Sequence, residues 1–499
     1  MTSAKPAIPL DEFLQRAGAD KIVEELKLHF RNKQLVVSDV TDAQGNQYVD
    51  LVQEGGGVLG VALVGYTYVL EKMGIRFFSL AGTSAGSINA MLLACAGNKE
   101  DEKVEKIISQ ILSLDFFDLV DGKQSNRKFT KRVKSAVQKF LMKKNFFKRI
   151  FRIIKWVLIT LLGLMLACFI LNFFLPAVAK WIGLGTGILL LIIGIFIISL
   201  KKLFTSFSKN GYGLNEGKVF HDWLREAISG NHVFNNNSES AINHTGDFAR
   251  HFVRLPPGLT LKHDPRRGNH TPPDTPMITI ITCDIVSECK IEFPRMWDLY
   301  WAKQEEVHPA DFVRASMSIP VFFETFSVTG IRQKSSFAIW DRHLNWQNEK
   351  KQIPDKAQFI DGGILSNFPI NVFYNPNFPV PRMPTFGVRL QDGIIDSVNR
   401  SNNTFLKYLK SFFSTLRFHF DRDFITKNRA YNFGVKLIDV KEHSWLNFFM
   451  DDEEKILLFR KGALAAADFL RNFDWEHYKA ERLRNFQMGV EQFDNPTNL

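Results

Sequence analysis

The first hundred residues alternate between short apolar runs that predict strands, glycine-rich turns, and longer apolar runs that predict helices. YVDLVQ at 48–53 predicts a strand, and a turn rich in glycine leads from it into a helical pattern that ends at Gly74. IRFFSLAG at 75–82 predicts a second strand, and SINAMLLACAG at 87–97 predicts the helix that follows. This alternation predicts an α/β fold with a mostly parallel central sheet.

The glycine turn after the first strand has two interpretations. Gly55, Gly57 and Gly60 satisfy G-x-G-x-x-G between a strand and a helix, which is also the dinucleotide-binding pattern. That function needs an acid about 20 residues further on, at the end of the second strand, to hold a ribose. The second strand instead runs into Gly82-Thr83-Ser84-Ala85-Gly86. The dinucleotide interpretation is therefore the weaker one.

The segment at 82–86 matches G-x-S-x-G in the setting that a nucleophilic serine requires. A strand before it and a helix after it predict a strained turn that exposes the Ser84 hydroxyl, and Gly82 and Gly86 let neighbouring segments pass closely. The start of a helix also favours the negative charge that develops during acyl transfer. Ser84 is therefore the candidate nucleophile.

The upstream glycine turn then gains a function. Acyl transfer passes through an oxyanion, and glycine backbones let N–H groups approach it. We expect an oxyanion hole formed by the N–H groups of Gly55, Gly56, Gly57 and Ala85. The alternative is a tight turn that binds no ligand.

The usual base for a nucleophilic serine is histidine, and the chain has twelve. None of them lies in a sequence context that is typical of a catalytic base. Those at 244, 263 and 270 lie in a polar stretch that predicts a loop, and His308 precedes a proline. A better candidate is Asp361, where a predicted strand ends in an acid followed by Gly362 and Gly363. The carboxyl end of a strand is where α/β active sites gather.

The chain resembles the patatin-like phospholipase family in three motifs and their order: GGGVLG at 55–60, GTSAG at 82–86 and DGG at 361–363. GLNEGKVFHDWLREAI at 213–228 is similar to the family's lid-region helix, and FVRASMSIPVFF at 312–323 to the segment before its aspartate. Asn367 and Pro369 also follow DGG as in the family. The similarity covers about 50–100 and 205–390. One departure is Leu59, where the family often carries Arg or Lys.

The resemblance implies a three-layer sandwich and a Ser-Asp dyad that works without histidine, cofactor or metal. Ser84 would attack an ester carbonyl, Asp361 would accept its proton, and water would hydrolyse the acyl-enzyme. A lipid acyltransferase would use the same dyad with an alcohol acceptor, and a non-catalytic membrane sensor or scaffold is a weaker alternative. The sequence favours a hydrolase of the phospholipase A or lysophospholipase type.

An apolar stretch at 156–200 interrupts this pattern and predicts a transmembrane hairpin. Lys180 is its only charge, and segments 156–175 and 181–200 each reach the roughly 20 apolar residues that a span needs. Basic residues flank both ends, which predicts that both ends are cytoplasmic. A hairpin of the soluble core is the alternative. We therefore expect an integral, two-pass membrane protein with its catalytic domain and both termini in the cytoplasm.

Charge is concentrated just before this stretch. The formal net charge is +11, and residues 127–155 hold twelve Lys or Arg and no acid. Helical periodicity there predicts a basic amphipathic helix, which either contacts anionic lipid headgroups or is simply solvated. Nucleic acid is not expected as a partner because no binding motif accompanies the charge. The four cysteines have no metal-like spacing and suggest a reducing compartment.

These observations predict four regions. Residues 1–142 and 205–390 form the catalytic domain, 143–204 hold the basic helix and the hairpin, and 391–499 form a helical C-terminal region packed on that domain. The expected partners are a membrane phospholipid or lysophospholipid substrate and the lipid bilayer. The sequence leaves the oligomeric state and the role of the C-terminal region open.

Overall fold

The structure is a computed structural model that describes most of the chain outside the apolar stretch. The described residues are 8–114, 116–119, 211–229, 241–267, 275–348, 352–391 and 419–494, with scattered positions at 152–205, 411 and 415. The chain divides into two compact units. The first contains 1–119, 217–320 and 325–499, and the second contains 120–216 and 321–324.

A mixed sheet forms the centre of the first unit. Ten described strands belong to it, and its main path runs β12-β11-β2-β3-β6-β10-β9. Its strands are β1 (Val40–Thr41), β2 (Gln47–Gln53), β3 (Ile75–Thr83), β5 (Thr260–Leu261), β6 (Ile278–Asp284), β7 (Cys289–Phe293), β9 (Phe326–Thr329), β10 (Lys356–Asp361), β11 (Thr385–Gln391) and β12 (Val435–Asp439). Parallel pairs join β12, β11, β2, β3 and β6. The other pairings described in this sheet are antiparallel.

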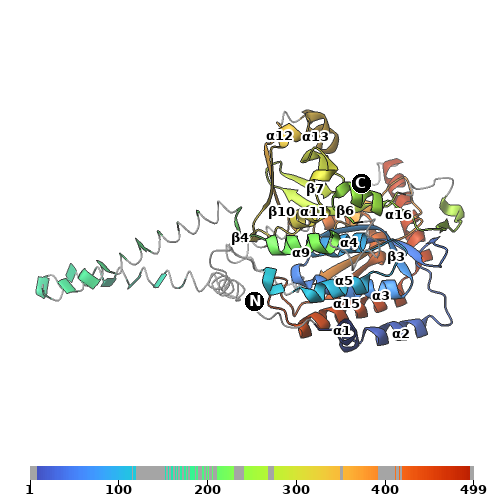
Figure 1. The fold of residues 1–499 in the computed structure, drawn as a ribbon, viewed down its shortest axis with the longest axis horizontal. Helices are drawn as coiled ribbons and strands as arrows, with labels where there is room; N and C mark the ends of the chain where they lie inside the picture. Colours follow the sequence, from blue (N-terminus) through green and yellow to red (C-terminus); the bar gives the residue numbers. More distant parts are fainter. Residues whose placement is uncertain are drawn as a thin grey trace. The chain divides into compact units, whose positions relative to one another are not determined.

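Every α-helix whose bounds the structure defines belongs to the first unit (Figure 1). They are α1 (Leu10–Ala17), α2 (Ala19–His29), α3 (Val61–Lys72), α4 (Ala85–Cys95), α5 (Val104–Ser113), α9 (Lys218–Ser229), α10 (Thr245–Phe252), α11 (Pro309–Ser316), α12 (Ile331–Lys334), α13 (Phe337–Leu344), α15 (Asp452–Asn472) and α16 (Trp475–Asp494). In the second unit, β4 (Gly213–Asn215) pairs in parallel with β8 (Val321–Phe323). The predicted α/β fold is confirmed, but the central sheet, which was predicted to be mostly parallel, is mixed.

Burial explains why β3 lies inside the sheet. All nine of its residues are buried, as expected for a strand covered on both faces. It pairs in parallel with β2 on one side and with β6 on the other. Its carboxyl end is therefore fixed from both sides, and that end leads directly into the candidate nucleophile.

A close helix crossing joins the C-terminal region to the start of the chain. Figure 1 shows α15 beside α3. A Cβ atom on Gly65 of α3 would lie 2.0 Å from the Phe459 carbonyl oxygen, and one on Gly462 of α15 would lie 1.8 Å from the Ala62 carbonyl oxygen. Glycine at both positions lets the two backbones approach. Helix α15 lies within the C-terminal region at 391–499, for which the sequence predicts helical structure.

The predicted membrane spans at 156–175 and 181–200 are not supported. Among the described residues, no helix combines the length and the apolar composition that crossing a membrane requires. Helices α15 and α16 have 21 and 20 residues, but charged residues recur along both. The prediction of an integral two-pass protein with cytoplasmic termini is therefore wrong on this finding. A span requires one continuous apolar helix, and an apolar run in the sequence does not by itself establish it.

Other predictions fall on residues outside the described part of the chain. The segment predicted to form a basic amphipathic helix before the apolar stretch lies almost entirely outside the described residues, as does much of 156–200. Most of 392–418, in the C-terminal region that is predicted to be helical, lies outside them too.

Candidate active site

The strand–turn–helix predicted around Ser84 is present. Ser84 lies between β3 and α4 with φ 51° and ψ −118°, a conformation in which a residue with a side chain is strained. Two glycines make room for the turn. A Cβ atom on Gly82 would lie 2.4 Å from the Gly86 carbonyl carbon, and one on Gly86 would lie 2.3 Å from the Gln53 carbonyl oxygen. The sharp turn therefore depends on glycine on both sides of the serine.

Hydrogen bonds from distant segments hold the strained turn in place. The Ser84 N–H donates to the Ser316 hydroxyl over 2.9 Å, and that hydroxyl donates to the Ile281 carbonyl of β6 over 2.6 Å. The Thr83 hydroxyl donates to the Ser366 carbonyl over 2.9 Å. Ser84 itself is 4% exposed. The turn is thus fixed by α11, by β6 and by the loop that follows the DGG motif.

Strand register places Asp361 level with Ser84. Thr83 of β3 pairs with Ile281 of β6, so Ser84, the next residue, is level with Thr282. Asp361, at the end of β10, pairs with Thr282 from the other side. One strand therefore separates the two residues, which corresponds to about 10 Å between their backbones, or two strand spacings. Both lie at the same level of the sheet.

The aspartate is itself held by its neighbours. Asp361 is 9% exposed, and one of its carboxylate oxygens accepts a hydrogen bond of 2.7 Å from the Gly363 N–H. Its own N–H donates to the Ser318 carbonyl over 2.9 Å. A Cβ atom on Gly362 would lie 2.2 Å from the Ile281 carbonyl oxygen, and one on Gly363 would lie 2.4 Å from Oδ1 of Asn367. Both glycines of the DGG motif are therefore required for this packing.

The glycine turn lies against the serine, but its three glycines are not equivalent. A Cβ atom on Gly55 would lie 3.2 Å from Cβ of Ser84. The Gly55 N–H, however, donates to the Asn367 carbonyl over 3.0 Å. For the N–H groups of Gly56, Gly57 and Ala85, the described part of the chain provides no acceptor within hydrogen-bonding distance. The N–H groups of these three residues therefore have donor capacity left for a ligand, whereas Gly55 has a protein partner.

The remaining motif glycine, Gly60, packs the turn onto the nucleophile helix. It lies at the end of a 3₁₀ turn, Gly57–Gly60, and a Cβ atom on it would lie 3.0 Å from Cβ of Ala85. The other side of this turn meets the C-terminal region. The Val58 N–H donates to the Trp445 carbonyl over 3.1 Å, and a Cβ atom on Gly57 would lie 2.2 Å from the same oxygen.

Asn367 joins the glycine turn to the DGG loop. Its side-chain N–H donates to the Gly55 carbonyl over 3.1 Å, while its own carbonyl accepts from the Gly55 N–H. Asn367 is 4% exposed. The two backbone groups of Gly55 are therefore both bonded to one residue. This double link fixes the turn beside Ser84 relative to the loop that carries Asp361.

Sequence reasoning missed the residue that holds this loop. Asp421 is 5% exposed, and its carboxylate accepts from the Ser366 hydroxyl at 2.8 Å, the Asn367 N–H at 3.0 Å and the Phe368 N–H at 2.8 Å. Burial raises the pKa of the Asp421 carboxyl, and these three donors oppose the increase. Nothing in the local sequence around Asp421 marks it as functional.

A second buried carboxylate lies behind the glycine turn. Glu54 is 3% exposed, pairs with Arg389 over 3.3 Å and accepts from the Leu390 N–H over 2.7 Å. Burial raises its pKa, and the charge of Arg389 opposes this. Glu54 directly precedes Gly55 in the chain. Its bonds to β11 therefore fix the start of the turn.

Comparison with known proteins places this arrangement in a family. Residues 51–374, more than half of the chain, match the family described as patatin-like phospholipase. A 47-residue segment, 9% of this chain, is 55% identical to the Uncharacterized protein YqhO of Bacillus subtilis (strain 168) and spans 16% of that protein. The crystal structure of VipD from Legionella pneumophila aligns with 90% of this chain and 73% of its own, at 14% identity and a TM-score of 0.35, which is too low to support a conclusion. On the family match, the chain belongs to the patatin-like phospholipases.

Proposed function

We propose that this chain hydrolyses carboxylic esters of phospholipids or lysophospholipids, with Ser84 as nucleophile and Asp361 as proton acceptor. The family consists of lipid hydrolases, and the dyad is the specific assignment made here. One observation supports it above all others. A strained serine and a buried aspartate occupy the same level of the sheet on either side of β6.

The proposed reaction begins with transfer of the Ser84 hydroxyl proton to the Asp361 carboxylate. Oγ then forms a bond to the ester carbonyl carbon, and the carbonyl oxygen becomes an oxyanion. Collapse of this intermediate breaks the bond to the lipid alcohol, which takes the proton from Asp361. Water next attacks the acyl-serine with the same aspartate as base, and fatty acid and free Ser84 are formed.

The oxyanion is assigned to backbone donors whose N–H groups are free of protein acceptors among the described residues. These are Gly56 and Gly57 of the turn and Ala85 at the start of α4. The helix dipole of α4 adds to this stabilisation at its first residues. Loss of one such donor costs about 2.7–4 kcal/mol in other serine hydrolases. Gly55 acts differently, because its N–H holds Asn367 and its proximity keeps the space beside Ser84 small.

Fatty acid release from phospholipid and hydrolysis of a short nitrophenyl ester test this proposal. We expect Ser84→Ala and Asp361→Asn each to lower kcat by at least about 10³-fold. Ser113→Ala and Asp355→Asn are matched controls, because Ser113 bonds locally at the exposed end of α5 and Asp355 is exposed just before β10. Both controls should retain wild-type rates.

Circular dichroism shows whether each variant is folded, and product analysis shows which reaction the enzyme catalyses. Folded Ser84→Ala or Asp361→Asn protein with wild-type activity would exclude the dyad. Adding a competing alcohol separates hydrolysis from acyl transfer, since a transferase would form a new ester in place of free fatty acid. Formation of that ester as the main product would replace the hydrolase assignment by the acyltransferase one.

A further inference from the structure

A small cavity lies at the opposite end of α4 from Ser84. Its volume is about 40 Å³, and the loop after α4 and the end of α10 form its walls. A water molecule needs roughly 10–15 Å³ measured in this way, so the cavity can hold about three waters or one small oxyanion. Helix α4 has 11 residues, which separates the cavity from Ser84 by about 16 Å along the helix. The cavity is thus distinct from the candidate active site.

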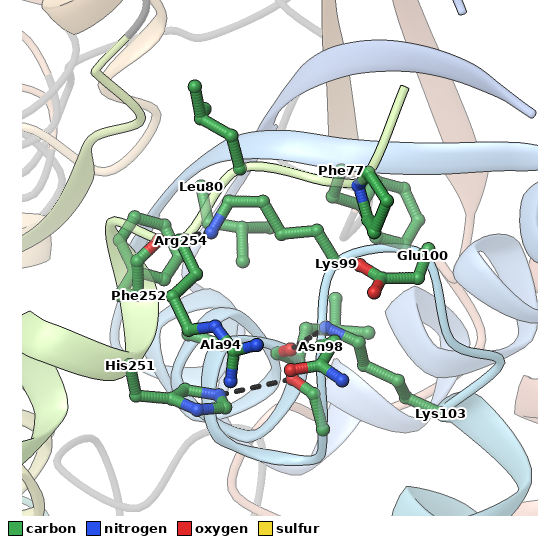
Figure 2. A pocket seen from close by; sticks show the side chains of 14 residues that line it. Phe77, Leu80, Ala94, Asn98, Lys99, Glu100, Lys103, His251, Phe252 and Arg254 are labelled. Carbon is green, nitrogen blue, oxygen red and sulfur yellow. Dashed lines mark hydrogen bonds between the residues drawn. The ribbon is translucent and has the colours of Figure 1, made fainter. Parts of the chain in front are cut away.

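Basic side chains surround this cavity (Figure 2). Lys99, Lys103, His251 and Arg254 line it, and Glu100 is the one acid among the described residues that do so. Lys99 and Lys103 are each 7% exposed. Two lysines buried to this extent beside each other are unusual, because a buried charge is normally paired with an opposite one.

Helix capping explains only part of this arrangement. Lys99 donates to the carbonyl of Phe252, the last residue of α10, and Lys103 donates to the Leu93 carbonyl in the last turn of α4 over 2.9 Å. Cations are favourable at helix C-termini. Each ammonium group has three N–H donors, however, and the described residues offer each of these lysines a single hydrogen-bond acceptor. Arg254 has no carboxylate partner within the described part of the chain.

The pKa values of the two lysines show the effect of burial. Burial and the charge of Lys103 lower the pKa of Lys99 to about 7. Burial lowers the pKa of Lys103 to about 8, although several groups on adjacent elements oppose this. Those opposing groups are Glu71, Asp101, Cys95 and Glu100. These groups therefore offset only part of the effect of burial on the pKa of Lys103.

We propose that Lys99, Lys103 and Arg254 form a binding site for a phosphate group. When both lysines are protonated, the three cationic side chains and the one acid that line the cavity give an excess of two positive charges, which favours a dianion over a carboxylate. The phosphate could belong to free inorganic phosphate or to a glycerophosphate headgroup. Both present terminal phosphate oxygens, and the cavity volume of about 40 Å³ limits recognition to the phosphate and its first substituent.

Calorimetric titration of the full chain with inorganic phosphate, glycerol phosphate, sulfate and acetate at constant ionic strength tests the site. We expect phosphate and sulfate to bind and acetate to bind more weakly. Arg254→Gln should weaken binding by about 10-fold or more, as loss of one charged hydrogen bond predicts. Arg250→Gln is the matched control, because Arg250 is a nearby exposed arginine on α10 that does not line the cavity and pairs with Asp247.

Proton uptake gives an independent readout. Sulfate does not titrate near neutral pH, so any protons taken up from the buffer when it binds at pH 7.5 are bound by the protein. We expect uptake, because an anion favours the charged form of Lys99 and Lys103. Lys99→Met should reduce this uptake.

The probes also separate the two sources of phosphate. Binding of inorganic phosphate supports a site for the free ion, and binding of glycerol phosphate alone supports a headgroup site. The absence of binding by phosphate, glycerol phosphate and sulfate, or equal affinity in wild type and Arg254→Gln, would overturn the proposal. Esterase activity measured in parallel shows whether the variants are folded, and it tests the Ser-Asp dyad separately.

Discussion

The strongest test of the active-site scaffold is a change at Asp421, which lies outside the segment matched by the family. Its carboxylate accepts three hydrogen bonds from 366–368, and Asn367 in turn holds Gly55 beside Ser84. Asp421→Ala would leave three buried donors without an acceptor, at about 1–3 kcal/mol each. The total, roughly 3–9 kcal/mol, approaches the whole stability of a typical domain. Asp421→Ala is therefore expected to unfold or to lose the loop conformation.

Asp421→Asn is the variant that measures the effect on activity. One amide oxygen can keep the two backbone donors, so we expect a loss of only about 1–3 kcal/mol from the weaker uncharged bonds. A displacement of the loop by 1 Å is expected to lower kcat by about 100-fold while KM changes little. Urea denaturation and nitrophenyl ester hydrolysis measure the two effects.

A matched control lies two residues away. Asp423 is partly exposed and pairs with Lys427 in the next helical turn, so Asp423→Asn should change stability by less than about 0.5 kcal/mol and leave kcat unchanged. An Asp421→Asn protein with wild-type stability and wild-type kcat would show that this carboxylate does not position the catalytic loop.

Two further predictions concern packing and charge. Gly462→Ala places a Cβ atom 1.8 Å from the Ala62 carbonyl oxygen, so it should destabilise the protein by about 1–3 kcal/mol in urea, and unchanged stability would refute the close crossing of α3 and α15. Lys99, with its pKa lowered to about 7 in the folded state, binds fewer protons there than in the unfolded chain, so wild-type stability should rise relative to Lys99→Met between about pH 7 and pH 10 in phosphate-free buffer. A stability difference independent of pH in that window would contradict the burial of a neutral lysine.

Local sequence patterns predicted the elements that carry the site. The apolar run of β3, the glycines around Ser84 and the acid at the end of β10 each follow from residues close together in the chain. The sequence could not show that Asp421 reaches 366–368 or that Trp445 lies on the glycine turn, because these contacts join segments tens of residues or hundreds of residues apart. Nor did it distinguish Gly55, whose N–H is used by Asn367, from Gly56 and Gly57. That difference depends on tertiary hydrogen bonding.

For the apolar stretch, the sequence predicted a feature that the described residues do not support. Length and composition at 156–200 predicted two spans, but the described helices include none that could cross a membrane. Hydropathy reports a tendency to leave water and does not specify a continuous helix. The α/β core, in contrast, was predictable because strand and helix periods, turn glycines and motif order all agreed.

The central claim is that Asp361 activates Ser84, and the rate of covalent labelling tests it most directly. A fluorophosphonate ester reacts with an activated serine, and mass spectrometry of the peptide that contains residue 84 identifies the site. We expect wild type to be labelled at Ser84 and Asp361→Asn to be labelled about 10²–10⁴-fold more slowly, the range that a general base contributes. Equal labelling rates in the two proteins, or modification of a different serine, would contradict the account.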